Sequence, residues 1–264
     1  MTPVVVRTGP APQPVVVRKA GCIPIPTLML FANPEARSLL ANRHRRTPCV
    51  LLLDTSGSME GPKIRRLNAG FRAFRSDIQR NAMAAQSVEL CVISFGPVKV
   101  QSEFSLLKEM PDLQFNAEGA TPLKEALELA MLKVTERKRL YQDHGISYYR
   151  PWIFLLTDGE PTDNFGGLCS GYRALLRPLQ LAAQERKFTL FTVGVGVSDQ
   201  GRQVLNELSQ PFGGRCLDLD TLKFEEMFLW LSGSLSRVSQ SSPGERVQLV
   251  DPTVGDELYD GWVL

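Results

Sequence analysis

The sequence lacks the features that mark a membrane-spanning or a secreted protein. Its 264 residues contain no apolar stretch near the length of about twenty residues that a membrane-spanning helix needs. The first residues, Met1-Thr2-Pro3, do not begin the charged-then-apolar pattern of a signal peptide, and prolines interrupt the segment repeatedly. We therefore expect no membrane partner, and a secreted adhesive protein is disfavoured.

Cysteine and excess charge are also scarce. A net charge of +2 predicts no field strong enough to define a nucleic-acid partner. The one dense basic run, at residues 43–46, predicts a solvated loop ahead of a strand. No two cysteines have the close spacing of a zinc site or a redox dithiol, so reduced thiols and a cytoplasmic location are expected. The five cysteines are Cys22, Cys49, Cys91, Cys169 and Cys216.

What is present is an ordinary globular composition, 43% hydrophobic and 22% charged, with two unusual ends. In residues 1–48, the sequence Pro-Val-Val-Val-Arg occurs at 3–7 and again at 14–18. This N-terminal extension could form a short hairpin, add an edge strand to the main sheet or serve as an interaction arm, and the sequence leaves that choice open. Residues 239–264 are polar and predict a loose C-terminal tail. The main domain is expected at residues 49–238.

Strands and helices alternate through that domain. Continuous apolar runs, typical of strands buried on both faces, are followed by segments with apolar residues at steps of three and four, typical of amphipathic helices. The predicted strands are 49–53, 88–95, 98–104, 152–156, 188–195 and 215–219. The predicted helices begin near Pro62 and after Thr121-Pro122, with Thr121 as the cap, and lie within 175–186, 201–209 and 224–238.

This order predicts an α/β fold. We expect a doubly wound, mostly parallel central sheet with helices on both faces. The tight turn Gly96-Pro97 joins the strands 88–95 and 98–104, so this pair is expected to be antiparallel. Ligands of such sheets bind at the carboxyl ends of the strands, which is where chemistry is expected.

Three junctions at those ends are rich in hydroxyl and carboxylate oxygens. Asp54, Ser56 and Ser58 follow the first strand, Thr121 precedes a helix, and Asp158 follows the strand 152–156. Such hard ligands suit Mg²⁺, Mn²⁺ or Ca²⁺ and suit Zn²⁺ or copper poorly. Three neutral hydroxyls and two carboxylates leave the ion under-coordinated. The ion would therefore accept a carboxylate from outside.

The pattern Asp54-x-Ser56-x-Ser58, then Thr121, then Thr157-Asp158-Gly159, resembles the metal-ion-dependent adhesion site (MIDAS) of von Willebrand factor A (VWA) domains. The resemblance covers residues 49–238 and implies a Rossmann-like sheet with one antiparallel edge strand. It also implies that Ser56, Ser58 and Thr121 bind the metal directly, while Asp54 and Asp158 often act through water.

In detail the chain resembles the bacterial TerY-type members, associated with tellurium resistance. The segments 48–59, 149–154, 157–163 and 230–232 carry this likeness. It implies a Ser/Thr kinase and a PP2C-type phosphatase as partners, in a stress or tellurite response. Residues 1–30, the stretch 38–46 and the loop 166–171 depart from that pattern.

The absence of catalytic groups beside these oxygens favours a binding module over an enzyme. We expect a metal-dependent interaction module that grips an acidic residue of a partner protein. The alternative is a metal-dependent phosphohydrolase, but the second aspartate that its haloacid-dehalogenase pattern needs is Ser56 here. No phosphate-cradling loop and no site histidine is present. A third hypothesis is a structural role with a vestigial metal site.

Overall fold

The fold is that of a computed structural model in which residues 39–162, 170–214, 216–219, 223–242, 245, 247–250 and 258–263 are described. The chain divides before Asn42, and the architecture below is that of the unit from Asn42 onward. Most of the N-terminal extension, with Cys22, and the segment 163–169, with Cys169, lie outside the described residues. No helix in the described part of the chain is long and apolar enough to cross a membrane.

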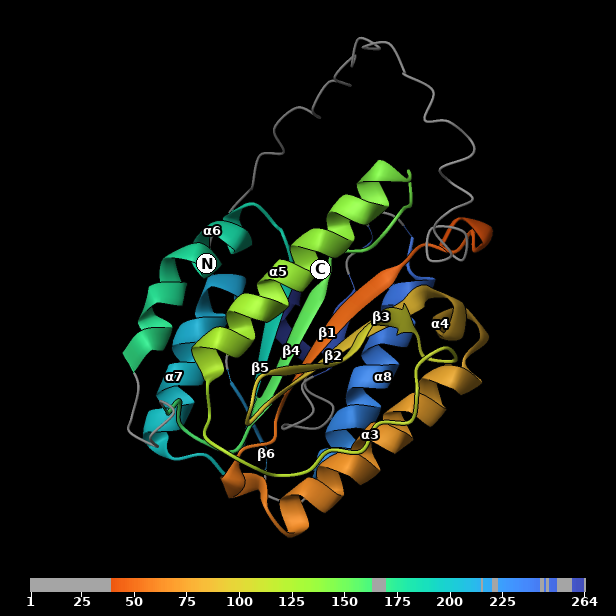
Figure 1. Ribbon diagram of the computed structural model, residues 1–264. Coiled ribbons are helices and arrows are strands. Elements are labelled where there is room, and N and C mark those ends of the chain that lie inside the picture. Colours follow the sequence, from red (N-terminus) through yellow and green to blue (C-terminus); the bar gives the residue numbers. More distant parts are fainter. Residues whose placement is uncertain are drawn as a thin grey trace, which may run out of the picture. The chain divides into compact units, whose positions relative to one another are not determined.

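A six-stranded sheet forms the centre, in the order β3-β2-β1-β4-β5-β6 (Figure 1). All neighbours are parallel except β2 and β3, so the expected fold class and antiparallel edge strand are confirmed. The strands β1, β2, β4 and β5 are buried along their whole length. The strand bounds are β1 Thr47–Asp54, β2 Val88–Phe95, β3 Lys99–Leu106, β4 Trp152–Thr157, β5 Thr189–Val195 and β6 Leu217–Leu219.

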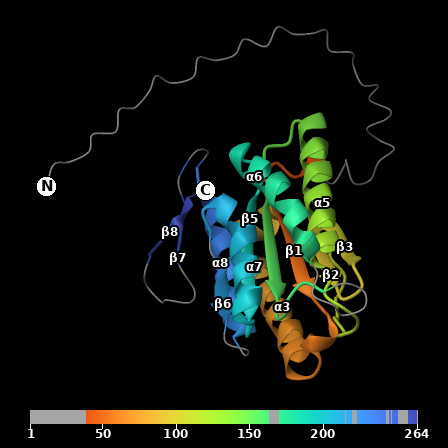
Figure 2. The same cartoon turned by 90° about the vertical axis from the view of Figure 1, so that its left-hand side faces the viewer.

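Helices cover both faces of the sheet and bury two separate hydrophobic clusters (Figures 1 and 2). On one face, α3 (Pro62–Arg80) and α8 (Phe224–Gln240) pack against alternate residues of β1 such as Leu51. On the other face, α5 (Leu123–Asp143), α6 (Leu176–Gln184) and α7 (Asp199–Ser209) pack against residues such as Leu52. Because successive strand residues point to opposite faces, one apolar run serves both clusters.

The described cysteines behave as the sequence predicts. Cys49 and Cys91 are buried and free, and burial raises the pKa of both thiols, that of Cys91 to about 12. Burial also raises the pKa of Cys216 to about 12. These thiols therefore remain protonated and pack as small apolar side chains.

The predicted helices differ from the structure in one cap and one missing helix. Pro62 does begin α3, but Thr121 does not cap α5, whose N-cap is Pro122 with no side-chain hydrogen bond. A short helix, α4 (Ala82–Ser87), was not predicted; the side chain of Asn81 caps it by accepting from two of its amides. The 3-10 helices η1 (Gly57–Met59), η2 (Ser170–Leu175) and η3 (Gln210–Phe212) complete the unit.

The residues predicted as a loose tail contain ordered structure. β7 (Gln248–Val250) and β8 (Leu258–Val263) pair as a separate two-stranded antiparallel sheet. Leu249 is completely buried and belongs to the same hydrophobic cluster as α8. The described residues of this segment therefore differ from the loose tail that its composition predicts.

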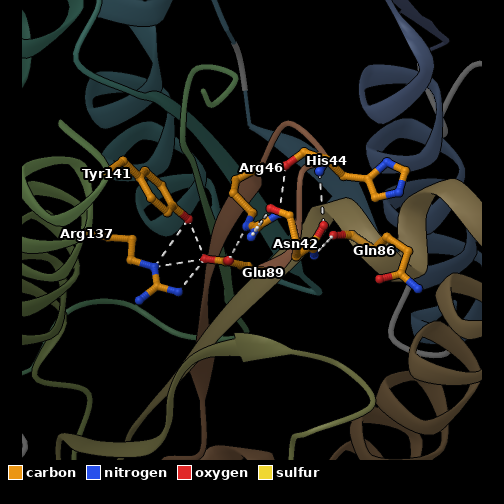
Figure 3. Close-up of polar contacts among 7 residues, drawn as sticks. All are labelled: Asn42, His44, Arg46, Gln86, Glu89, Arg137 and Tyr141. Atoms are coloured by element: carbon orange, nitrogen blue, oxygen red, sulfur yellow. Dashed lines mark hydrogen bonds and ion pairs between the residues drawn. The ribbon is translucent and has the colours of Figure 1, made fainter. Parts of the chain in front are cut away.

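At the amino ends of the parallel strands, Arg43 and His44 are exposed in a loop, as the basic run predicts, but Arg46 is buried in an ionic network. Glu89, at the start of β2, is 2% exposed and accepts bonds from three side chains (Figure 3). Arg46 Nε lies 2.7 Å from Glu89 Oε1, and Arg137 Nε and Nη2 lie 2.8 and 2.5 Å from Oε2. The hydroxyl of Tyr141 donates to the same Oε2.

Arg46 also ties down the chain that leads into β1. Its guanidinium donates to the carbonyl oxygens of His44 at 2.7 Å and Asn42 at 3.0 Å (Figure 3). The amide of Asn42 in turn donates to the carbonyl of Gln86 at 2.8 Å. The segment entering β1 is therefore anchored to β2 and α5 by buried charge.

We predict that Glu89→Gln lowers the free energy of unfolding by about 3–5 kcal/mol, because it leaves two buried guanidinium groups without their carboxylate. Urea unfolding followed by circular dichroism measures the change. The matched control is Glu103→Gln, which removes a carboxylate 64% exposed on β3 that pairs with Lys133. That change should lower the free energy of unfolding by less than about 1 kcal/mol. Equal effects of the two variants would show that the network does not stabilise the fold.

Candidate metal centre

The register of the central strands brings two of the predicted junctions together. β1 and β4 are parallel, with Leu53 paired to Leu156, so Asp54 and Thr157 follow at the same edge of the sheet. Figure 1 shows η1 and the start of α3 at this edge. The carboxylates of Asp54 and Asp158 therefore belong to neighbouring strand ends although they are distant in sequence.

Asp54 is completely buried, and both of its carboxylate oxygens are engaged. Oδ1 accepts from the backbone amide of Ser56 at 2.8 Å, and Oδ2 accepts from the hydroxyl of Thr157 at 2.5 Å. Burial raises the pKa of Asp54 to about 6, and the hydrogen bonds from Ser56 and Thr157 oppose that rise. The Asp54 carboxylate therefore orients the backbone turn at Ser56 and does not face solvent.

The two serines and Asp158 form a continuous row of oxygens. The hydroxyls of Ser56 and Ser58 lie 3.0 Å apart, and Ser58 donates to Asp158 Oδ1 at 2.7 Å. The second oxygen of Asp158 accepts from the ammonium of Lys63, in the first turn of α3. Ser58 is exposed, whereas the Asp158 side chain is fully buried, so the row runs from the surface into the sheet edge.

Thr121 reaches the same place through a loop held by backbone contacts. Gly57 N–H donates to the carbonyl of Gly119 at 2.9 Å, which joins the two loops directly. Gly119 has a φ of +76°, and a Cβ on Gly96 would lie 2.3 Å from the carbonyl oxygen of Glu118. A side chain at position 96 would therefore push the loop away, so only glycine permits this approach.

Gly159 shows that the hydroxyls converge. A Cβ placed on it would lie 3.7 Å from both Ser58 Oγ and Thr121 Oγ1. Thr121 is 5% exposed. The three predicted junctions thus meet at one point.

Sequence reasoning missed the residues that brace this site. Thr162 accepts from the Thr121 amide at 2.8 Å through its hydroxyl and donates its own amide to the Thr121 carbonyl at 3.1 Å. No sequence signal marks that role. The sequence does contain a signal for Lys63. A lysine in the first turn of a helix is unfavourable beside the positive end of the helix dipole, which indicates a compensating contact.

Glu160 follows Gly159 and contacts the start of α7. Its Oε1 accepts from the hydroxyl of Ser198, the N-cap of α7, and the Ser198 hydroxyl accepts from Gly201 N–H at 3.0 Å. A cavity of about 410 Å³ opens beside it, lined among others by Tyr172 and Asp199. Asp163 and residues 166–169 of the predicted loop lie outside the described residues.

The donor set fits a small divalent cation. In an octahedral Mg²⁺ shell with bonds of about 2.1 Å, neighbouring oxygens lie roughly 3 Å apart. The oxygens of Ser56, Ser58 and Asp158 follow one another at 3.0 and 2.7 Å. All are hard ligands, which suit Mg²⁺, Mn²⁺ or Ca²⁺.

The model of the von Willebrand factor type A domain matches residues 49–223. The chain belongs to this family. VWA domains commonly bind a divalent metal at the MIDAS and commonly act as protein interaction modules. No curated protein sequence matches the chain.

Solved structures show the same fold at low sequence identity. The pilus adhesin SpaC from Lactobacillus rhamnosus GG, in an open conformation, aligns with a TM-score of 0.57 and 15% identity, covering 83% of this chain and 37% of that one. This VWA chain thus spans little more than a third of the adhesin that it matches. At 15% identity this likeness shows the fold alone.

Two further VWA-like structures align less well. The vWF domain of the pili tip protein Mfa5 from Porphyromonas gingivalis gives a TM-score of 0.48 and 10% identity, covering 76% and 99% of the two chains. The mussel byssus protein PTMP1, with a zinc-occupied MIDAS motif, gives 0.44 and 12%, covering 73% and 48%.

We predict that Thr162→Val loosens the Thr121 loop, because valine keeps the shape but cannot accept the Thr121 amide. The loss of one such hydrogen bond should lower the local free energy of opening by about 0.5–1.5 kcal/mol. Faster hydrogen exchange of the Thr121 amide is the measurement, with Thr162→Ser, which retains the oxygen, as the control. Unchanged exchange in Thr162→Val would show that the hydroxyl does not hold the loop.

Proposed function

We propose that this VWA domain binds a divalent cation, Mg²⁺ or Mn²⁺, and uses it to grip an acidic residue of a partner protein. Ser56, Ser58 and Thr121 would hold the ion, and Asp54 and Asp158 would orient those hydroxyls and balance its charge. The bound ion would supply an electrophilic coordination position. The observation that carries the proposal is the convergence of three hydroxyls beside two buried carboxylates at one edge of the sheet.

The environment of Asp54 supports binding over phosphoryl transfer. A nucleophilic carboxylate must present an oxygen to the substrate, but both oxygens of Asp54 accept hydrogen bonds and the residue is 0% exposed. The alternative phosphohydrolase would need this side chain to leave its place. A screen of phosphatase substrates with Mg²⁺ and Mn²⁺ separates the two proposals, and turnover that is lost in Asp54→Asn would favour the enzyme.

The finer identity rests on resemblance alone. The TerY-type segments support a cytoplasmic regulator or scaffold in a stress or tellurite response. A Ser/Thr kinase and a PP2C-type phosphatase would then be the partners to test first. Within this proposal, residues 1–48 serve as an extension, 49–238 as the VWA domain and 239–264 as a C-terminal segment.

We predict that Asp54→Asn weakens Mg²⁺ and Mn²⁺ binding by about 10–100-fold, the usual effect of changing a group that orients metal ligands. Asparagine keeps an acceptor for the Ser56 amide, so the fold should survive. Isothermal titration calorimetry measures the affinity. Asp112→Asn, which alters a fully exposed carboxylate beside Arg75, is the matched control and should bind as wild type. A wild-type chain that binds neither metal would favour the vestigial site.

The partner is sought by affinity capture from a cell extract with the full chain in Mg²⁺, read by mass spectrometry. A partner recovered with wild type, and lost with Asp54→Asn and with chelator, is the expected result. Equal recovery in all three samples would contradict metal-dependent binding.

A further inference from the structure

Lys63 lies against the metal centre and is not part of the family pattern described above. Its ammonium group pairs with Asp158 Oδ2, and Ser58 donates to the other oxygen, Oδ1, at 2.7 Å. The Asp158 side chain is 0% exposed, while that of Lys63 is 27% exposed. Both oxygens of the buried carboxylate are therefore satisfied by groups of the chain itself.

Helix formation does not explain a lysine at this position. Lys63 is the second residue of α3, whose first turn contains no acidic residue. The amino end of a helix carries partial positive charge, so a cation there is unfavourable. Attraction to Asp158 offsets that repulsion, because it acts over a short distance on a carboxylate shielded from water.

The same contact obstructs a divalent ion. A metal that approaches the Ser56, Ser58 and Asp158 oxygens meets a positive charge already seated on Asp158. Two cations held this close to one carboxylate repel each other. The ion must therefore displace the ammonium group, or bind against it.

We propose that Lys63 is a tethered cation that competes with the divalent metal for Asp158 and thereby sets the metal affinity of the site. This inference rests on the proposed metal-binding function and assigns Lys63 as a positioning residue of that site. Lys63 lies in part toward solvent, so its long side chain can leave Asp158 without disturbing the helix.

The test is calorimetric titration of Mn²⁺ into the full chain and into Lys63→Met, which keeps the length of the side chain and removes its charge. Lys63→Met should bind Mn²⁺ about tenfold more tightly than wild type, the effect of removing one close cation from a carboxylate. Lys63→Arg, which keeps the charge, should bind about as weakly as wild type.

Arg65→Met is the matched control, since Arg65 is an exposed cation near the same end of α3 and does not pair with Asp158. It should change Mn²⁺ affinity much less than Lys63→Met does. If both variants tighten binding equally, general charge and not the contact with Asp158 sets the affinity, and the inference is wrong.

Thermal unfolding provides a second readout that keeps the test independent of any partner. In chelator, Lys63→Met should unfold at a lower temperature than wild type, because Asp158 has lost its counter-charge. Saturating Mn²⁺ should then raise its unfolding temperature more than that of wild type, since tighter binding stabilises the folded state more.

The outcomes distinguish this inference from the function on which it rests. Equal Mn²⁺ affinities of wild type and Lys63→Met would overturn the role of Lys63 and leave the metal site intact. Chains that all fail to bind Mn²⁺ would overturn both.

Discussion

The parallel pairing of β1 with its two neighbours is the constraint on which the site depends. β1 is buried along its whole length between β2 and β4, and the register that pairs Leu53 with Leu156 fixes where each chain leaves the sheet. Thr157 therefore lies beside Asp54 and donates to it at 2.5 Å. A slip of one residue would turn every side chain of β1 to the wrong face, so the hydrophobic clusters that hold the register also hold the site.

Buried carboxylates are compensated differently at the two ends of the sheet. At the amino end, Glu89 is enclosed by Arg46, Arg137 and Tyr141, and its carboxylate has no room for another ligand. Burial alone would lower the pKa of Arg137, and the Glu89 carboxylate raises it above its usual range. At the carboxyl end, Asp158 is countered by the partly exposed ammonium group of Lys63. The first arrangement fixes the chain, and the second can be exchanged for an ion.

The sequence predicts best the elements whose burial is visible in local composition. Strands buried on both faces read as continuous apolar runs, and the order of the site motifs follows from the strand order. Charge proved harder, because residues 43–46 read as a solvated run although Arg46 is 1% exposed. Glu89, a charged residue within the mostly apolar segment Val88–Phe95, was the sequence signal that a buried cation lies nearby. The bracing by Thr162 is invisible in sequence, because it depends on how two distant loops meet.

Charge balance explains why one external carboxylate would suit this centre. A divalent ion bound there would be neutralised by Asp54 and Asp158, both buried, which would leave the Lys63 ammonium as one positive charge at the mouth of the site. A single incoming carboxylate would complete the coordination of the ion and pair with the displaced lysine. A neutral ligand would leave the positive charge of Lys63 uncompensated next to the metal. Two carboxylates would bring more negative charge than the site needs. The lysine that hinders the ion in isolation would therefore favour an acidic partner once the ion is bound.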